Sequence, residues 1–348
     1  MLARLPRPAA LLVLLGFLAV LVWLAIEPGA PVRPVAQGVK RYTDMMLYHD
    51  VVAQMDAGKG YYRAAVDLHR AHHYPLRPFF AVRPPVLAEA GHLIGWGALQ
   101  MIAYGAALAL VFVWAIGTEG KLHVAERIGV ALLVGVGASE ISAISLMAMH
   151  ELWSALFLGF ALAVMLWWRE RWWLALPAVA LALAVRELAL PFLLLAAAFA
   201  AWDRHWREFA AWLALAALFF AYMAFHAAML GQLVTPQDIA SPGWHGMLGL
   251  RAFAKGVQFT SLLQELPNTL GIVVAMLPML GWAALDGRRG AFALLLFVGY
   301  AAMIALFARP GNFYWAMMAA PAYLAGLALL PRALGQLWRT IRSAPSRA

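Results

Sequence analysis

The sequence predicts an all-α polytopic membrane protein with about ten transmembrane helices and a long extracytoplasmic first loop that carries short amphipathic helices. Three observations support this fold class. Of the 348 residues, 64% are hydrophobic and 12% are charged, and this charged fraction is about half that of a soluble globular domain. Apolar runs recur along the chain, and the short connections between them hold clusters of basic residues. A chain with this pattern is solvated mainly by lipid.

The first predicted span is Ala9–Ile26, an apolar run that follows the basic segment Met1–Pro8. The run is longer than the apolar part of a typical signal peptide, so we interpret it as an uncleaved span with its N-terminus in the cytoplasm. After a polar loop, Val86–Ile94 is predicted as a short interfacial helix and Trp96–Ile116 as the second span. Further spans are predicted at Ile128–Ala138, Leu152–Trp168, Leu174–Val185, Leu188–Ala201, Phe209–Leu230, Leu270–Leu285, Ala291–Ala308 and Phe313–Leu330.

The charges of the connections predict the topology. With the N-terminus inside, every short basic loop and the basic C-terminal tail face the cytoplasm, in agreement with the positive-inside rule. The two long polar loops, 28–85 and 231–269, then face the opposite side. We therefore expect residues 1–348 to form a single integral membrane domain in the bacterial cytoplasmic (inner) membrane.

Composition also excludes several classes of chemistry. The chain has no Cys, which excludes disulfides, zinc–thiolate sites and thiol nucleophiles. Its net charge of +9 is dispersed between apolar runs, so membrane lipids and anionic ligands explain it better than nucleic acid does. We expect no nucleic-acid partner.

The first long loop holds the candidate catalytic residues. The stretch 41–85 is the longest polar interval of the chain. Thr43 can cap a helix that begins at Asp44, and in that helix Asp44 lies on the same side as Tyr48, whereas Asp50 lies about 120° away. Burial on this more apolar face would raise the pKa of Asp44 and make it a stronger base. The alternative is that Asp44 merely complements the positive end of the helix.

Basic side chains of the same loop suggest an anion site. Arg70, Arg77 and Arg83 can each bind a phosphate in bidentate fashion, or they can pair with lipid headgroups or local acids. The four histidines of the loop, with Asp44 or Asp50, are candidate ligands of a divalent metal. Their spacing matches no strong ligand pattern, so we expect no metal and no cofactor. The histidines are His49, His69, His72 and His73.

The order of residues in this loop resembles a known superfamily. Asp44 stands four residues before Tyr48, Gly58 follows, and then come the pair Tyr61-Tyr62 and a Pro-rich return to the membrane. This pattern is similar to that of the membrane-embedded GT-C glycosyltransferases, which use polyprenyl-phosphate-linked sugars. The resemblance implies that Asp44 is the catalytic or substrate-positioning acid. The superfamily commonly has a second acid directly after it, where this chain has Met45.

Polar residues elsewhere are predicted to support this site from the same face. Arg186-Glu187 stands between two apolar runs and is either a phosphate contact or an internal Arg–Glu brace. Aromatic residues near Arg309 either stack on a sugar or isoprenoid or belong to an interfacial belt. Asp44 and Asp50 are the predicted catalytic residues. The predicted substrate-binding residues are Tyr48, Tyr61, Tyr62, Arg70, His73, Arg77, Arg83, Glu151, Arg186, Glu187, Arg309, Asn312 and Tyr314.

The function expected from the resemblance is transfer of a sugar from a polyprenyl-phosphate donor to an extracytoplasmic glycan or lipid acceptor, at the extracytoplasmic face. One alternative is a lipid-linked-sugar flippase or small-solute transporter, which would place polar residues deep within several spans. Another is a membrane acyltransferase, for which His150 is the candidate catalytic histidine. The residues identify neither the sugar nor the acceptor.

Overall fold

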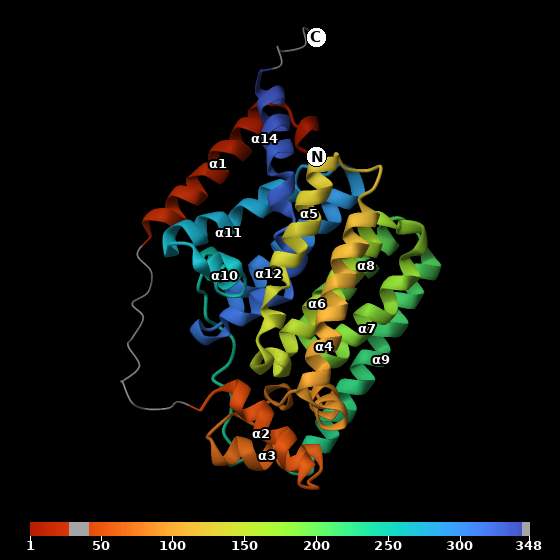
Figure 1. Cartoon of the computed structure of the whole chain (residues 1–348), viewed down its shortest axis with the longest axis vertical. Coiled ribbons are helices and arrows are strands. Elements are labelled where there is room, and N and C mark those ends of the chain that lie inside the picture. Colours follow the sequence, from red (N-terminus) through yellow and green to blue (C-terminus); the bar gives the residue numbers. More distant parts are fainter. Residues whose placement is uncertain (28–41, 343–348) are drawn as a thin grey trace.

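The computed structural model describes residues 1–27 and 42–342 (Figure 1). Within these residues the regular elements are helices, and the sole β-type pairing is one bridge between Arg77 and Ala240. The all-α class is therefore confirmed for the described part of the chain. The helices are α1 (Arg7–Ile26), α2 (Asp44–Asp56), α3 (Tyr61–Ala71), α4 (Val86–Gly117), α5 (Val124–Gly137), α6 (His150–Trp167), α7 (Ala175–Val185), α8 (Leu190–Trp202), α9 (Trp206–Gly231), α10 (Leu250–Phe259), α11 (Asn268–Trp282), α12 (Gly287–Phe307), α13 (Ala320–Tyr323) and α14 (Gly326–Arg342). Short 3-10 helices are η1 (Leu2–Arg4), η2 (Phe79–Ala81), η3 (Ser139–Ser142), η4 (Ile144–Ala148), η5 (Arg169–Leu174), η6 (Glu187–Ala189), η7 (Leu262–Glu265) and η8 (Pro310–Met318).

The predicted number of membrane spans is wrong. Among the described residues, five helices are long and apolar enough to cross a membrane. Several predicted spans are shorter: α5, α7 and α8 have 14, 11 and 13 residues. At about 1.5 Å per residue they are roughly 17–21 Å long, whereas the hydrocarbon core is about 30 Å thick. The five long helices are Arg7–Ile26, Phe79–Gly117, His150–Trp167, Trp206–Gly231 and Gly287–Phe307.

Breaks in the backbone explain most of this difference. Helix α7 ends at Val185 because Arg186 is extended, with φ −150°. The predicted span Phe313–Leu330 is divided between η8, α13 and the start of α14, and its one proline, Pro321, and its one glycine, Gly326, favour such interruptions. In α4, Gly95 has φ +77° and separates two helical parts, where the sequence predicted an interfacial helix followed by a span.

The exposure of apolar side chains fits an integral membrane protein. Helix α6 lies at the centre of the bundle, and 83% of its most apolar window is buried. Helix α9 buries 22% of the corresponding window and exposes large side chains such as Leu218 and Phe225. Helix α4 likewise exposes Leu108 and Phe112. An apolar surface of this extent is not stable in water, so lipid is the solvent it suits.

The two ends of the bundle differ in character. Helices α2 and α3 lie together at one end, and the N-terminus and α14 lie at the other (Figure 1). At this second end, ion pairs join the predicted cytoplasmic connections to one another. The pairs are Met1–Asp286, Arg169–Glu208, Arg288–Asp203 and Arg332–Glu126. Residues 28–41 of the first loop and 343–348 of the basic tail lie outside the described residues.

The first long loop forms a small folded unit with part of the second. Thr43 caps α2 by accepting a hydrogen bond from the Met46 amide at 3.3 Å, as the sequence predicted. Arg70 donates to both carboxylate oxygens of Asp238, at 2.7 and 2.8 Å, and this guanidinium holds the pKa of the Asp238 carboxyl well below its usual range. Backbone hydrogen bonds then attach the segment 239–241 to Leu76 and Arg77. We call the segment 238–249 the strap.

We expect reporter fusions at Lys121, Arg204 and Arg288 to lie in the cytoplasm, and fusions at Lys59 and Gly243 to lie on the opposite side. The reason is that the short connections carry the basic residues, which are retained in the cytoplasm. The measurement is reporter activity in whole cells. A cytoplasmic Lys59 would contradict the assignment, because α2 and α3 would then face the wrong compartment.

Candidate functional site

A cavity of about 930 Å³ lies between α2 and the ends of the membrane helices. Its wall is built from α2, from the return to the membrane before α4, from residues 186–188, from the strap and from η8. The charged side chains that line it are Asp44, Arg83, Arg186, Glu187 and Arg309. Segments far apart in the sequence therefore place acids and arginines around one space.

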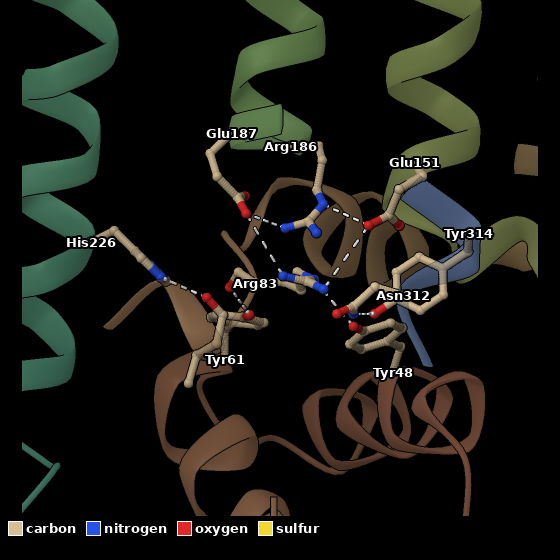
Figure 2. Close-up of polar contacts among 10 residues, drawn as sticks. Tyr48, Tyr61, Arg83, Glu151, Arg186, Glu187, His226, Asn312 and Tyr314 are labelled. Carbon is tan, nitrogen blue, oxygen red and sulfur yellow. Dashed lines mark hydrogen bonds and ion pairs between the residues drawn. The ribbon is translucent and has the colours of Figure 1, made fainter. Parts of the chain in front are cut away.

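Two arginines and two glutamates form a largely buried quartet on the side of this cavity next to the ends of α6 and α7 (Figure 2). Arg186 donates from Nε to Glu151 at 2.6 Å and from Nη1 to Glu187. The Nη atoms of Arg83 lie 4.0 Å from Glu151 and 3.9 Å from Glu187. Arg186 is 2% exposed and Glu151 is 1% exposed. Because buried charges are unfavourable unless paired, the equal number of both signs is what stabilises this cluster.

Local structure places each member of the quartet at the end of an element. Glu151 lies in the first turn of α6, and Arg186 is the extended residue that ends α7. Glu187 begins η6, and Arg83 lies in the Pro-rich segment that returns to α4. The quartet therefore connects the folded unit of the first loop to the centre of the bundle. It also shows that the Arg–Glu brace proposed for Arg186-Glu187 is present.

Aromatic and histidine side chains fix the position of Arg83. Its Nε donates to the Tyr48 hydroxyl at 3.2 Å, and the Tyr61 hydroxyl donates to its carbonyl oxygen. His226 of α9 contacts the neighbouring Val82 carbonyl at 3.1 Å (Figure 2). Burial raises the pKa of the Tyr48 phenol, so this hydroxyl stays neutral beside the guanidinium. The segment before α4 is thus held from both sides.

Arg309 differs from the other two arginines of the cavity. Its backbone amide and its Nε both donate to Asn312, at 3.1 and 3.3 Å. Its guanidinium lies 5.8 Å from the centre of the Trp244 ring, and Nη1 is 3.5 Å from the Ser241 hydroxyl. Within the described residues it makes no ion pair with a carboxylate. Arg309 therefore contributes a positive charge to the cavity that no described acid compensates.

The two candidate catalytic acids have different surroundings. Asp44 lines the cavity and has no hydrogen-bond or ion-pair partner among the described residues. Asp50 lies away from the cavity and accepts a hydrogen bond from the Tyr42 hydroxyl at 2.6 Å. Asp44 and Asp50 therefore lie on different sides of α2, as the sequence predicted, and only the Asp50 carboxylate has a hydrogen-bond partner in the described part of the chain.

The structure brings some of the predicted substrate-binding residues together and leaves others apart. Nine predicted site residues line the cavity: Asp44, Tyr48, His73, Arg83, Arg186, Glu187, Arg309, Asn312 and Tyr314. Glu151 lies behind them in the quartet. Arg70 and Arg77 instead bind Asp238 of the strap. Arg70 donates to the Asp238 carboxylate, and Arg77 donates from Nε to the Asp238 backbone carbonyl at 2.9 Å. Tyr61 and Tyr62 support the segment before α4 through Arg83 and His226. The sequence predicted that these four side chains bind substrate, but in the structure they form hydrogen bonds with distant residues of the protein instead.

The strap supplies further cavity residues. Trp244 is a candidate acceptor contact from the sequence, whereas Ser241 and Pro242 were not predicted. Ser241, Pro242 and Trp244 line the cavity, together with Phe80 of the first loop. The signal for the strap is weak in sequence, because a Ser-Pro-Gly turn in a long loop does not reveal what it contacts. The histidines also separate: within residues 1–27 and 42–342, no group of three or more His, Asp or Glu residues is arranged to hold a metal.

Comparison with protein-family models, with curated proteins and with solved structures gives no match to this chain. Membership of the GT-C superfamily therefore stays a prediction that depends on the residues of the first loop. The geometry of the cavity is the basis for the function proposed below.

We expect Arg186→Met to destabilise the protein strongly, by about 3–5 kcal/mol, because it leaves Glu151 buried without its closest cation. The double variant Arg186→Met/Glu151→Leu should recover much of that loss, since one arginine and one glutamate then remain. Thermal unfolding in detergent measures both. Lys59→Met is the control: it removes a surface pair with Asp67 and should cost about 0–1 kcal/mol. Equal losses in the single and double variants would contradict the charge-balance explanation.

The protein should lose stability as the pH falls from 7.5 to 5, and His69 should account for about 2 kcal/mol of that loss. His69 is 5% exposed and donates from Nδ1 to the Pro75 carbonyl at 3.0 Å. Burial lowers its pKa to about 4, so below pH ~6.5 the unfolded chain binds a proton that the folded chain does not. This contribution is full above the unfolded pKa and declines toward the folded pKa.

Melting temperatures of the wild type and of His69→Gln at both pH values measure this contribution. The variant should show a smaller decrease between pH 7.5 and pH 5, whatever its stability at pH 7.5. The same decrease in both proteins would remove His69 as the cause.

Proposed function

We propose that this protein is a membrane glycosyltransferase of the GT-C type. It transfers a sugar from a polyprenyl-phosphate donor to an extracytoplasmic glycan or lipid acceptor, in the cavity beneath α2. The observation that carries the proposal is that an unpaired carboxylate, Asp44, and an uncompensated guanidinium, Arg309, line the same cavity of about 930 Å³. These are the two charges that such a reaction needs on opposite sides of the bond that breaks.

The donor phosphate is the leaving group, so it requires stabilisation of negative charge. In the reaction, the bond between the anomeric carbon and the phosphate oxygen breaks, and both electrons leave with the polyprenyl phosphate. Arg309 is the best-placed cation for this charge, because no described carboxylate competes for it. Arg83 offers a second, weaker contact, since its Nη atoms lie about 4 Å from Glu151 and Glu187. Fixed charges in a site shielded from water are effective for this purpose.

The acceptor hydroxyl requires a base, and Asp44 fits that role. The hydroxyl oxygen attacks the anomeric carbon, and its proton passes to the Asp44 carboxylate. The Asp50 carboxylate accepts a hydrogen bond from the Tyr42 hydroxyl, so we assign Asp50 a structural role in α2.

Aromatic side chains of the cavity suit the remaining parts of the substrates. Trp244 lies beside Phe80, with ring centres 4.9 Å apart, and Tyr314 is held by Asn312 at 3.2 Å. Rings in such positions bind the apolar faces of sugars and the first isoprene units of a lipid donor. The protein would act in the bacterial cytoplasmic membrane, with this cavity on the extracytoplasmic face.

The alternatives receive less support from the same residues. A flippase or transporter requires a polar path through the spans, whereas the quartet, Asp44 and Arg309 gather around one cavity at one end of the bundle. An acyltransferase requires an accessible histidine. His150 is 3% exposed and packs against the Tyr48 ring, with ring centres 4.9 Å apart.

Asp44→Asn should reduce sugar transfer by about 10²–10⁴-fold, because it keeps the size of the side chain and removes proton acceptance. Asp50→Asn is the matched control on the same helix and should cost much less. The assay is transfer of labelled sugar from polyprenyl-phosphate donors in nanodiscs. An active Asp44→Asn with an inactive Asp50→Asn would reverse the two roles, and activity in both variants would exclude this loop as the active site.

Both variants should fold like the wild type. A half-buried acid in the first helical turn, such as Asp44, contributes about 0.3–1 kcal/mol, and Asn at position 50 keeps an oxygen that can accept from the Tyr42 hydroxyl. Donor binding separates a chemical defect from a structural one. If Asp44→Asn binds donor with unchanged affinity and does not transfer it, Asp44 acts in the chemical step.

A further inference from the structure

A second cavity, of about 650 Å³, lies at the end of the bundle opposite α2 and α3. It is formed between η5 and the first turn of α9. The function proposed above does not use it. Its lining includes Arg169, His205, Arg207 and the indole rings of Trp172 and Trp206.

The lining of this cavity holds two arginines and two glutamates, and two arginines next to it in the chain, Arg171 and Arg204, add positive charge. Glu208 is 1% exposed and is neutralised within the wall, by Arg169 and by a hydrogen bond from Trp212 Nε1 at 3.2 Å. Three exposed arginines in the lining or next to it in the chain have guanidinium groups with no ion pair or hydrogen bond within the described residues: Arg171, Arg204 and Arg207. Glu170 is the one acid of the lining that is similarly unpaired in the described part of the chain. The Nε atom of Arg169 is also buried without a partner. An anion is therefore the ligand that this cavity favours.

Tryptophans place the cavity at the depth of lipid headgroups. Trp173, Trp202 and Trp206 are 55%, 87% and 62% exposed, and they surround the ends of η5, α8 and α9. Exposed tryptophans at helix ends are typical of the interface between hydrocarbon and headgroups. Below this level, α9 exposes apolar side chains such as Leu213, along which an acyl chain can lie.

From this geometry we propose that the cavity binds the phosphate of an anionic phospholipid headgroup. Arg207 contacts the phosphate, Arg171 and Arg204 supply the surrounding positive potential, and Trp206 packs against the glycerol region. A basic pocket between helices at the predicted cytoplasmic face is a suitable site for a lipid of net negative charge. A zwitterionic lipid has the same phosphate but lacks the net charge that the unpaired arginines attract.

The test measures lipid binding by native mass spectrometry of the whole protein in detergent. Phosphatidylglycerol and phosphatidylcholine with identical acyl chains are compared. The wild type should prefer phosphatidylglycerol, and the variant Arg171→Gln/Arg204→Gln/Arg207→Gln should lose that preference by about tenfold or more. The control variant Arg4→Gln/Arg7→Gln/Arg342→Gln removes the same charge from the same end of the bundle and should keep the preference. The single variant Arg207→Gln should show part of the loss if the triple variant folds poorly.

Three outcomes would overturn the proposal. Equal binding of the two lipids by the wild type would show that net charge is not recognised. An equal loss in the control variant would show attraction to the surface as a whole rather than a site. Displacement of phosphatidylglycerol by millimolar inorganic phosphate would identify a site for the free anion instead of a lipid headgroup.

Discussion

The buried quartet is the interaction on which the rest of this structure depends. Glu151 and Arg186 are almost fully buried, where a charge would be prohibitive without a partner, and Arg83 and Glu187 are partly buried beside them. Glu151 and Arg186 come from neighbouring helices of the bundle, whereas Arg83 comes from the segment that connects the first loop to α4. Pairing them requires that the first loop dock against α6 and α7 in one orientation. That orientation also places α2 over the cavity, so the charge balance of the membrane core sets the geometry of the candidate active site.

The same requirement explains why α7 is short. For Arg186 to reach Glu151 on one side and Glu187 on the other, α7 has to end before it crosses the membrane. Extended and 3-10 backbone then lies between the apolar helices, in η3, η4 and η6. Such backbone is tolerated there only when protein encloses it or when it lines a polar cavity. The cavity and the shortened α7 are two consequences of one arrangement.

Local signals were predictable from the sequence, and long-range partners were not. The Thr43 cap, the phase difference between Asp44 and Asp50 and the break at Gly95 depend on neighbouring residues, and the structure has all three. The predicted number of spans was wrong because hydropathy does not indicate where the backbone of an apolar run stops being helical. The prediction that Arg70 binds substrate differs from the structure for another reason. Its partner, Asp238, is 168 residues away in the sequence, and no local pattern indicates that contact.

Charge compensation, more than proximity to the cavity, separates the roles of its three arginines. The two guanidiniums of the quartet face two carboxylates, so an added phosphate would compete with contacts that stabilise the fold. Arg309 is held by an amide oxygen, a hydroxyl and an aromatic ring, which orient a guanidinium without neutralising it. An anion bound there gains attraction and breaks no ion pair. The proposed donor phosphate therefore belongs beside Arg309 and the strap, with the quartet as the rigid wall against which the sugar is positioned.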